Sequence, residues 1–299
     1  MRDGNNMKTI TILMSTYNGA KYIDKQLESI YHQKGLDDYV LKLIIRDDGS
    51  CDDTIDIINL WRDRLTIDLL QGNNIGARDS FFYLLKTAPV SDYYAFCDQD
   101  DIWNDDKLYK AISRICEERT LYFSNIEYVD THEKKIGRKL LNDDFRFSLK
   151  RILMCNPANG CAMVWDNKLQ DIIIKVPEET FTMHDEFVCT VACLFGHVVY
   201  DDESTMSYRL HEANVTQSNS IKKKYKLWKK IWFGRKQYSL DKRAKMLLKF
   251  PLKEEDRKIL LDLSQYKKGL KRLKLFSQYR CEDFGIERSF KIRMLIGVL

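Results

Sequence analysis

The chain has 299 residues, of which 44% are hydrophobic and 31% charged, a balance typical of a globular protein with enough length for a sizeable core. No apolar run approaches the roughly 18 to 20 residues that a membrane-spanning helix needs, so a membrane span is not expected. The apolar run near the N-terminus is too short for a signal-peptide core, and we therefore expect a cytoplasmic protein. The eight cysteines show no CxxC spacing, which predicts reduced cysteines that pack in the core.

Charge is unevenly divided along the chain. Residues 1–220 contain 25 Lys and Arg against 36 Asp and Glu, a net charge of −11, whereas residues 221–299 contain 24 against 8, a net charge of +16. This change in composition predicts an acidic folded domain over residues 1–220 and a basic, α-helical C-terminal extension over residues 221–299. Nucleic-acid binding is not expected, because phosphate would repel the acidic domain.

The first hundred residues alternate between apolar, β-branched segments and segments with helical spacing. Strands are predicted at residues 8–15, 40–45, 65–70 and 93–97. A polar loop and a helix follow each of the first three. This alternation indicates βαβ crossovers and an α/β fold with a mostly parallel sheet flanked by helices. In such sheets ligands bind beyond the carboxyl ends of the strands.

The second hundred residues give a less regular pattern. We predict a helix from Lys107 to about residue 118, which Asp105 and Asp106 precede as helix-start acids. Further predicted elements are a strand at 121–126, a polar stretch to 144, a strand at 161–165, a helix at 184–195 and strands at 198–200 and 206–209. Trp103 and Trp165 are candidates for stacking on a sugar, although core packing is the commoner use of tryptophan.

Two acidic clusters follow predicted strands. Asp98-Gln99-Asp100 ends the fourth strand, and hard divalent cations with phosphate partners favour a few carboxylate oxygens of this kind. Asp98 and Asp100 would point to the same side if the strand geometry continued. A turn or helix cap explains this cluster equally well, and a tight turn with a cap explains residues 47–50. The interpretation of both clusters as parts of a binding site gains support, because a parallel sheet brings these loops and residues 16–18 to one edge.

Five blocks in order carry a resemblance to a known family. They are "ILMSTYNGAKYIDKQLESIYHQ", "LIIRDDGSCDDTIDII", "NNIGARDSFFYLL", "YYAFCDQDDIWNDDKL" and "MHDEFVCTVACLFGHVVYDDESTMSYRLHEANVT". Together they resemble family 2 glycosyltransferases, especially the rhamnosyltransferase-like bacterial branch with its DQDDIW-type, HDxW-type and YRxHxxN blocks. The resemblance covers about residues 7–217 and is specific for the family, though not for the sugar.

The resemblance implies a GT-A fold, a nucleotide-sugar donor and a divalent metal, Mg²⁺ or Mn²⁺. Carried over by position, it implies these site residues: Thr16, Tyr17 and Asn18 with Asp47 or Asp48 at the base and ribose, Arg78 near the nucleotide or its phosphates, Asp98 at the ribose or metal region, Asp100 and His211 at the metal or diphosphate, and Asp185 as the catalytic base. Glu186 competes with Asp185 as the base, because the branch often has an aromatic residue there. A plain helix cap is the other interpretation of Asp185.

The expected activity is inverting transfer of a sugar from a dTDP- or UDP-linked donor to a cell-surface polysaccharide or a lipid-linked glycan. The alternative is a nucleotide-sugar-binding protein of the same fold without transfer activity. A dinucleotide-binding fold is not supported, because the first strand-to-helix loop contains one glycine in place of GxGxxG. The basic segment 222–233, "KKKYKLWKKIWF", predicts peripheral contact with the inner face of the membrane. A solvated extension or an arm for homo-oligomer formation is the alternative.

Overall fold

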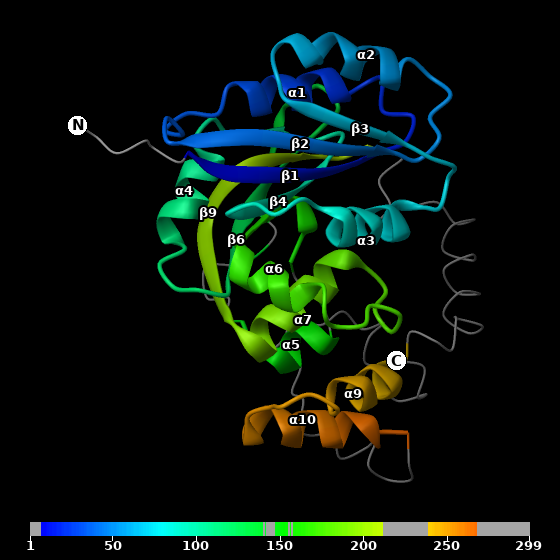
Figure 1. Cartoon of the computed structure of the whole chain (residues 1–299), viewed down its shortest axis with the longest axis vertical. Coiled ribbons are helices and arrows are strands. Elements are labelled where there is room, and N and C mark those ends of the chain that lie inside the picture. The colour runs from blue at the N-terminus through cyan, green and yellow to red at the C-terminus, as the bar shows by residue number, and fades with distance from the viewer. Residues whose placement is uncertain are drawn as a thin grey trace. The chain divides into compact units, whose positions relative to one another are not determined.

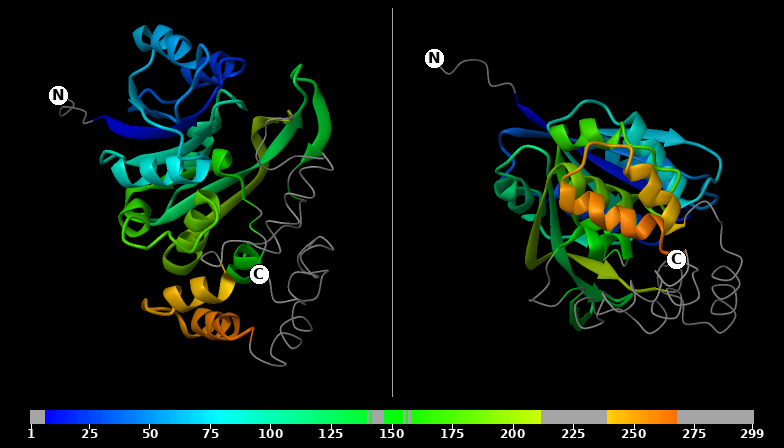
Figure 2. Two further views of the ribbon diagram at one scale, coloured as in Figure 1. Left: turned by 90° about the vertical axis from the view of Figure 1, so that its right-hand side faces the viewer. Right: turned by 90° about the horizontal axis from the view of Figure 1, so that it is seen from below.

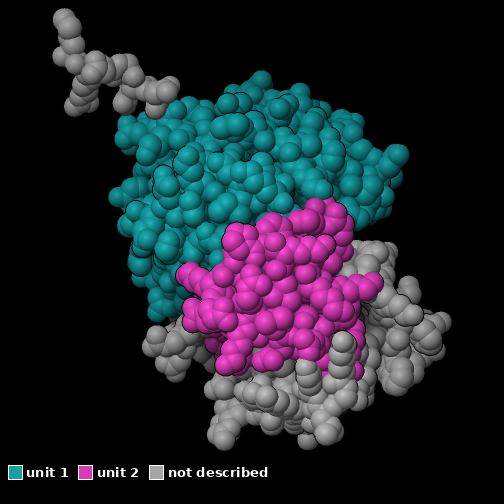
Figure 3. All heavy atoms as spheres, turned by 60° about the horizontal axis from the view of Figure 1, so that its bottom comes forward, with its two compact units in different colours: residues 1–146, 158–176, 191–211 teal, residues 147–157, 177–190, 212–299 magenta. Residues whose placement is uncertain are grey.

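The computed structural model of the chain describes residues 7–139, 141, 147–154, 156, 158–211 and 239–267. The chain divides into two compact units, coloured separately in Figure 3. The first unit comprises residues 1–146, 158–176 and 191–211, and the second comprises residues 147–157, 177–190 and 212–299. The predicted membrane-contact segment, 222–233, lies outside the described residues, so its role and the predicted domain boundary at residue 220 stay predictions.

A single nine-stranded sheet forms the centre of the first unit (Figure 1). Its strands are β1 (Lys8–Thr16), β2 (Tyr39–Asp47), β3 (Ile67–Gln71), β4 (Tyr93–Asp98), β5 (Ile102–Trp103), β6 (Thr120–Val129), β7 (Lys135–Lys139), β8 (Met163–Asp166) and β9 (His197–Arg209). They lie in the order β3-β2-β1-β4-β8-β6-β9-β5, and β7 pairs with β6. Figure 2 shows β6 and β7 as a hairpin that extends from the rest of the sheet.

Helices cover both faces of this sheet. Those of the first unit are α1 (Ile23–Tyr31), α2 (Thr54–Leu60), α3 (Ala77–Thr87), α4 (Lys107–Arg114) and α6 (Asn167–Ile173), with 3-10 turns η1 (Trp61–Asp63) and η2 (Gly160–Ala162). Helices α1 and α2 lie on one face, and α3 and α6 on the other (Figures 1 and 2). The second unit contains α5 (Leu149–Met154), α9 (Leu240–Leu247) and α10 (Glu254–Ser264), whereas α7 (His184–Phe195) begins in the second unit and ends in the first.

The predicted βαβ pattern is found in the N-terminal half of the sheet. Strand β1 pairs in parallel with β2 and β4, and β2 pairs in parallel with β3. Helices on both faces shield β1, whose Ile10, Ile12, Leu13 and Met14 side chains are fully buried. A strand buried on both faces has a continuous apolar sequence, which explains why the sequence predicted the strands of this half.

The C-terminal half differs from the sequence prediction in two respects. Strands β8, β7 and β5 pair antiparallel with their neighbours, so the sheet is mixed. The two strands predicted at 198–200 and 206–209 are one strand, β9, which runs parallel to β6 with register shifts near Asn125. The acidic residues between them resemble a turn in the sequence. In the structure Asp201 stays in the strand because its Oδ2 accepts a hydrogen bond from the buried Tyr122 hydroxyl at 3.0 Å.

Both tryptophans proposed for sugar stacking are core residues. Trp165 is fully buried and Trp103 is 3% exposed. The Trp165 ring lies 4.6 Å from the Phe96 ring, which in turn packs edge-on against Phe81 at 5.3 Å. These aromatic contacts join β8, β4 and α3.

Two further sequence predictions concern membranes and cysteines. Among the described residues, the helices are all too short or too polar to cross a membrane. The six cysteines in the described part of the chain are free, and Cys97, Cys161 and Cys189 are buried.

Asp166 links β8 and α6 to β6 and provides a test of the fold. Its Oδ1 accepts from Leu169 N at 2.8 Å, which caps α6, and its Oδ2 accepts from Thr120 N at 2.9 Å. We predict that Asp166→Ala lowers the free energy of unfolding by about 2–4 kcal/mol, because it removes a cap and leaves a buried N–H unpaired. Urea unfolding measures this change. Asp171→Ala, at an exposed position on the same helix, should leave stability unchanged, and an equal loss in both variants would contradict the assignment.

Candidate active site

The register of the parallel strands brings the predicted polar loops to one edge of the sheet. Thr16 at the end of β1 lies beside Asp47 at the end of β2, and Ser15 lies beside Asp98 at the end of β4. The Thr16 hydroxyl donates to Asp47 Oδ1 at 3.1 Å. The loops that follow β1, β2 and β4, which are distant in the sequence, therefore begin at neighbouring points. We number the loops after β1, β2, β3 and β4 as the first to the fourth loop.

Hydrogen bonds between side chains and backbone join the loop after β1 to the loops after β2 and β4. Asn18 has a φ of 47°, in the left-handed region that asparagine tolerates better than most residues. Its N–H donates to Ser50 Oγ at 2.9 Å, and its Oδ1 accepts from Cys51 N at 2.8 Å. Gln99 accepts from Tyr17 N at 2.9 Å and donates to Tyr17 O at 3.1 Å, while Tyr17 as a residue is 46% exposed. The backbone here is held firmly and leaves Tyr17 accessible.

Asp47 shapes the second loop from inside. Only 1% of this residue is exposed. Its Oδ2 accepts from the backbone N–H groups of Gly49 at 3.1 Å and Ser50 at 2.8 Å, and its Oδ1 accepts from the Ser50 hydroxyl at 2.5 Å. Gly49 has a φ of 86°, and a Cβ there would approach Gly72 O to 3.2 Å, so this turn requires glycine.

Asp48 holds the third loop, between β3 and α3. Its carboxylate accepts from the N–H groups of Ile75 and Gly76, both at 2.8 Å, and forms a 2.5 Å ion pair with Arg46. Both charged partners are buried. Arg78 follows in the first turn of α3, where its guanidinium lies 4.5 Å from the Phe82 ring centroid and pairs with neighbouring Asp79.

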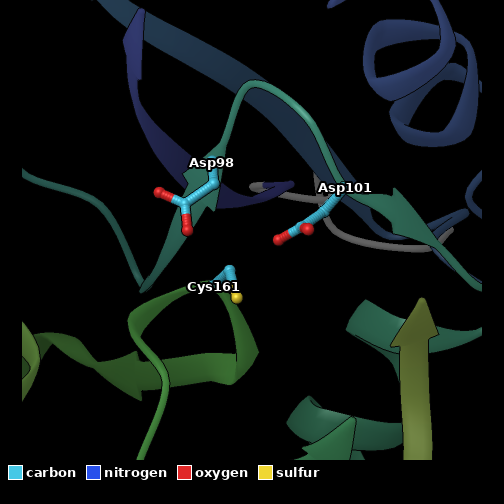
Figure 4. A group of neighbouring side chains, drawn as sticks. All are labelled: Asp98, Asp101 and Cys161. Atoms are coloured by element: carbon cyan, nitrogen blue, oxygen red, sulfur yellow. The ribbon is translucent and has the colours of Figure 1, made fainter. Parts of the chain in front are cut away.

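The fourth loop departs from the expected strand geometry. Strand β4 ends at Asp98, and Gln99 and Asp100 form a turn, so the strand geometry that would place Asp98 and Asp100 on the same side does not continue. Asp98 instead groups with Asp101 and Cys161 of η2, with ligand atoms within 4.8 Å of one another (Figure 4). Asp105 and Asp106 precede α4 but do not cap it with their side chains, since they pair with Lys34 and Lys110.

Asp100 and His211, the two residues expected at the metal or diphosphate, lie together. Asp100 Oδ2 is 2.8 Å from His211 Nε2, and the two side chains are 16% and 9% exposed. The His211 ring stacks on Tyr22 with ring centroids 4.8 Å apart. Residues 111 positions apart in the chain therefore form one polar corner.

Arg209 holds this corner in place. It is 2% exposed, and its backbone N–H donates to Asp101 Oδ1 at 3.2 Å while its Nε donates to Asp100 O at 3.1 Å. The guanidinium also lies 5.0 Å from the Tyr22 ring centroid and 3.4 Å from Glu133. One buried side chain thus connects β9, the turn from Asp98 to Asp101 (the aspartate-rich turn) and the β6–β7 hairpin.

Charge is concentrated beneath the turn. Burial raises the pKa of Asp101 well above its ordinary range, and the Asp100 and Asp98 carboxylates raise it further. Burial, with the Asp101 and Asp98 carboxylates, raises the pKa of the Cys161 thiol, which stays protonated and is therefore a weak metal ligand. Lys107 is fully buried on α4, and burial lowers its pKa to about 8. At neutral pH it still carries most of its positive charge.

The donor atoms in this corner fit a hard divalent cation. Carboxylate oxygens suit Mg²⁺ and Mn²⁺, and imidazole is a common ligand of transition metals. Asp100 and His211 present adjacent ligand atoms. Asp101 Oδ2 is buried and has no hydrogen-bond partner within the described residues, which is the position of an oxygen that a cation would satisfy.

The predicted base, Asp185, belongs to the second unit. It lies in the first turn of α7, and its Oδ1 accepts from Glu186 N at 2.6 Å. Burial raises the pKa of Asp185 to about 7, with a further contribution from the Glu186 charge. Glu186 is more deeply buried and forms an ion pair with Arg243. Burial lowers the pKa of the adjacent His184 to about 3, so its imidazole is neutral at physiological pH.

Sequence reasoning missed Arg209, Tyr22 and Lys107. Arg209 stands two residues before His211 in the YRxHxxN-like block, so the block itself offered a signal. Tyr22 and Lys107 read as ordinary helix-start residues and gave none.

The chain matches known glycosyltransferases in sequence and in fold. The family model described as Glycosyl transferase family 2 matches residues 11–172. The dTDP-rhamnosyl transferase RfbG of Shigella flexneri is 34% identical over 230 residues, which are 71% of this chain and 77% of the relative. The Escherichia coli UDP-Glc:alpha-D-GlcNAc-diphosphoundecaprenol beta-1,3-glucosyltransferase WfaP is 33% identical over 122 residues, 41% of this chain and 47% of that protein.

Solved structures share the fold at low sequence identity. S. aureus TarS 1-349 in complex with UDP-GlcNAc has a TM-score of 0.62 at 20% identity, covering 97% of this chain and 79% of that one. The mannosyltransferase PcManGT from Pyrobaculum calidifontis, in complex with GDP-Man and Mn²⁺, has a TM-score of 0.56 at 15% identity, covering 96% and 74%. The fold and the family match define a GT-A glycosyltransferase, as the family resemblance implied. The chain belongs to glycosyltransferase family 2.

Arg209 offers a test of how the aspartate-rich turn is held. We predict that Arg209→Lys lowers the free energy of unfolding by about 1–3 kcal/mol, because lysine keeps the charge but cannot reproduce the guanidinium's directed hydrogen bonds. Urea unfolding measures the change. Arg62→Lys, at an exposed position, is the matched control. Equal stability of the Arg209 variant and the wild type would show that the buried side chain does not hold the turn.

Proposed function

We propose that this glycosyltransferase inverts the anomeric centre while it moves a sugar from a dTDP- or UDP-linked donor to a hydroxyl of a cell-surface polysaccharide or lipid-linked glycan, assisted by Mg²⁺ or Mn²⁺. The observation that carries the proposal is the 2.8 Å distance between Asp100 Oδ2 and His211 Nε2, at the sheet edge where the loops after β1, β2 and β4 begin. A bound divalent cation supplies charge neutralisation for the departing nucleotide diphosphate.

In this proposal the N-terminal loops bind the nucleotide. Tyr17 is exposed and its backbone is held on both sides by Gln99, so its ring is available to the base. Asp47 and Asp48 accept hydrogen bonds from the loops themselves, and we assign them the role of shaping the ribose side of the site. Arg78 would contribute positive charge near the nucleotide or phosphates, and Asp98 would face the ribose or the metal.

We assign Asp185 as the general base that accepts the proton of the acceptor hydroxyl. A general base works best when its pKa lies near the operating pH, because a large fraction of it is then ionised while the carboxylate is still basic. The environment of Asp185 raises its pKa to about 7, which meets this requirement. The carboxylate would accept the proton from the acceptor hydroxyl as that oxygen forms the new glycosidic bond.

The names of the relatives support the donor and acceptor classes. RfbG is a dTDP-rhamnosyl transferase, which favours a dTDP-linked deoxysugar. WfaP is named for a UDP-Glc donor and a diphosphoundecaprenol-linked acceptor, which favours a lipid-linked glycan. TarS was solved with UDP-GlcNAc, and PcManGT with GDP-Man and Mn²⁺, which supports a nucleotide-sugar donor and a divalent metal.

Donor binding tests the proposal directly. Thermal unfolding with dTDP-rhamnose, UDP-Glc or UDP-GlcNAc in the presence of Mn²⁺ should reveal one donor that stabilises the protein, by about 2.7 kcal/mol at a concentration 100 times its Kd. EDTA should remove most of this stabilisation. Asp100→Asn should lose the same metal-dependent part, whereas Asp105→Asn, in the exposed pair with Lys34, should retain it. Donor stabilisation that is equal with Mn²⁺ and with EDTA would contradict metal assistance.

Asp185→Asn tests the base through both rate and stability. We expect kcat for transfer to fall by about 10²- to 10⁴-fold with donor binding retained, and the wild-type rate to fall as the pH drops below about 7. Because the folded pKa lies above the ordinary value, the unfolded chain ionises first and the folded state loses stability as pH rises from about 4 to 7. The asparagine variant should therefore be more stable than the wild type at pH 7.5, by up to about 4 kcal/mol.

This stability difference should shrink toward pH 4.5, where Asp185 is protonated in the folded state. Urea unfolding at the two pH values measures it. A fully active Asp185→Asn enzyme would remove Asp185 as the base.

A further inference from the structure

Helix α9 of the C-terminal segment carries a buried arginine that contacts the start of α7 within the second unit. Arg243 is 3% exposed. Its Nε and Nη2 donate to Thr180 O at 3.2 and 3.0 Å, and its Nη1 forms an ion pair with Glu186 Oε1. The guanidinium also lies 4.6 Å from the Phe181 ring centroid. One side chain therefore contacts residues 180, 181 and 186.

Glu186 completes this set of contacts. Its second oxygen, Oε2, accepts from the Thr182 hydroxyl at 2.7 Å, and the residue is 9% exposed. Both carboxylate oxygens thus bind groups of the protein. The Phe187 ring packs edge-on against Phe181 at 5.0 Å, so an apolar contact supports the polar ones. The turn 180–182 and the first turn of α7 are fixed to each other and to α9.

Helix α9 is itself anchored. Leu240, Ala244 and Leu247 are buried on it, and Leu260 and Leu263 are buried on α10. Beyond α10, Lys267 reaches back to Asp241 of α9 at 2.6 Å. The arginine therefore extends from a supported helix, and its position is set by packing as well as by its ion pair.

The geometry separates the two acids that compete for the role of base. Glu186 is held by Arg243 and Thr182, and an ion pair out of water keeps its geometry because separating the charges is costly. Within the described residues, Asp185 forms no ion pair with Arg243; its carboxylate accepts hydrogen bonds from Glu186 N at 2.6 Å and from the Asn156 side chain. The clamp on Glu186 therefore fixes the helix turn that carries Asp185.

We propose that Arg243 is a positioning residue: it clamps Glu186 and the carbonyl of Thr180 so that the first turn of α7 presents Asp185, and not Glu186, to the acceptor. This inference rests on the proposed function, in which Asp185 takes the acceptor's proton. It gives the C-terminal extension a role inside the enzyme, distinct from the predicted membrane contact of residues 222–233.

The first experiment measures hydrogen–deuterium exchange of the full-length chain. In Arg243→Met, backbone amides of residues 180–187 should exchange about tenfold faster than in the wild type, because the segment loses its clamp. Lys242→Met removes the same charge from the exposed side of the same helix and should leave exchange unchanged. Exchange in residues 180–187 that is equal in all three proteins would overturn the proposal, whether or not a transfer assay exists.

The second experiment measures steady-state transfer from the donor found by thermal unfolding, with Mn²⁺. Arg243→Met should lower kcat by about 10- to 100-fold while KM for the donor stays within about twofold, because misplacement of a catalytic group by about 1 Å costs rate and leaves donor binding intact. Arg243→Lys should recover part of the rate. Glu186→Gln, which keeps hydrogen-bonding atoms in place, should retain far more activity than Asp185→Asn.

Should Arg243→Met fail to fold, the double variant Arg243→Met/Glu186→Gln leaves no unpaired charge and should fold with kcat still reduced. Wild-type kcat in both the lysine and the double variant would overturn the clamp. A Glu186→Gln variant as inactive as Asp185→Asn would overturn it too. Full activity of Asp185→Asn would instead refute the proposed base, and the exchange comparison would then decide the clamp alone.

Discussion

The site depends on how the protein stabilises the aspartates at the strand ends, whose carboxylates are buried away from water. A buried charge is costly unless hydrogen bonds or an opposite charge satisfy it. Asp47 receives backbone and hydroxyl donors from its own loop, and Asp48 receives two backbone donors and the Arg46 guanidinium. Asp101 is compensated less completely, since one oxygen lacks a partner within the described residues. The degree of compensation distinguishes carboxylates that shape loops from those suited to bind a cation.

Hydrogen bonds between the loops also make the sheet edge rigid before any ligand binds. Gln99 joins the aspartate-rich turn to Tyr17, and Asn18 joins the first loop to Ser50 and Cys51. Each of these contacts links backbone in one loop to a side chain in another. Groups held in this manner need little reorganisation when substrate binds, which is the main contribution that a protein scaffold makes to positioning. The edge therefore works as one structural unit, and the loops are not independent.

The part of the fold that could be predicted from sequence is the part in which local pattern and tertiary position agree. Strands β1 and β4 and the second half of β2 are buried, β3 completes the alternation at the sheet edge, and all four end in polar loops, so both the strands and the clustering of their ends follow from the sequence. Strand β9 was harder, because its acidic middle is kept in the strand by Tyr122, a partner 79 positions away. Strand β5 has two residues, and it forms a strand because it pairs with β9.

Site residues divide in the same way. The motif residues Asp98, Asp100 and His211 could be located because the blocks that contain them resemble a family. Arg209 and Lys107 act from beneath the turn, and a buried cation is recognisable only when the carboxylates around it are known. No local pattern marks Arg243 as a partner of Glu186, which stands 57 positions earlier in a different helix.

Asp185 and Glu186 illustrate why environment, and not residue type, assigns a catalytic role. They are adjacent in one helix turn and both are partly withdrawn from water. An arginine from the C-terminal segment neutralises Glu186, which turns that acid into a structural anchor. Asp185 forms no ion pair within the described residues, and burial raises its pKa to about 7. In the proposed function this raised pKa is what suits Asp185 to act as a base near neutral pH. In the proposed function, a helix that is distant in the sequence thus determines which of the two neighbouring acids takes the acceptor's proton.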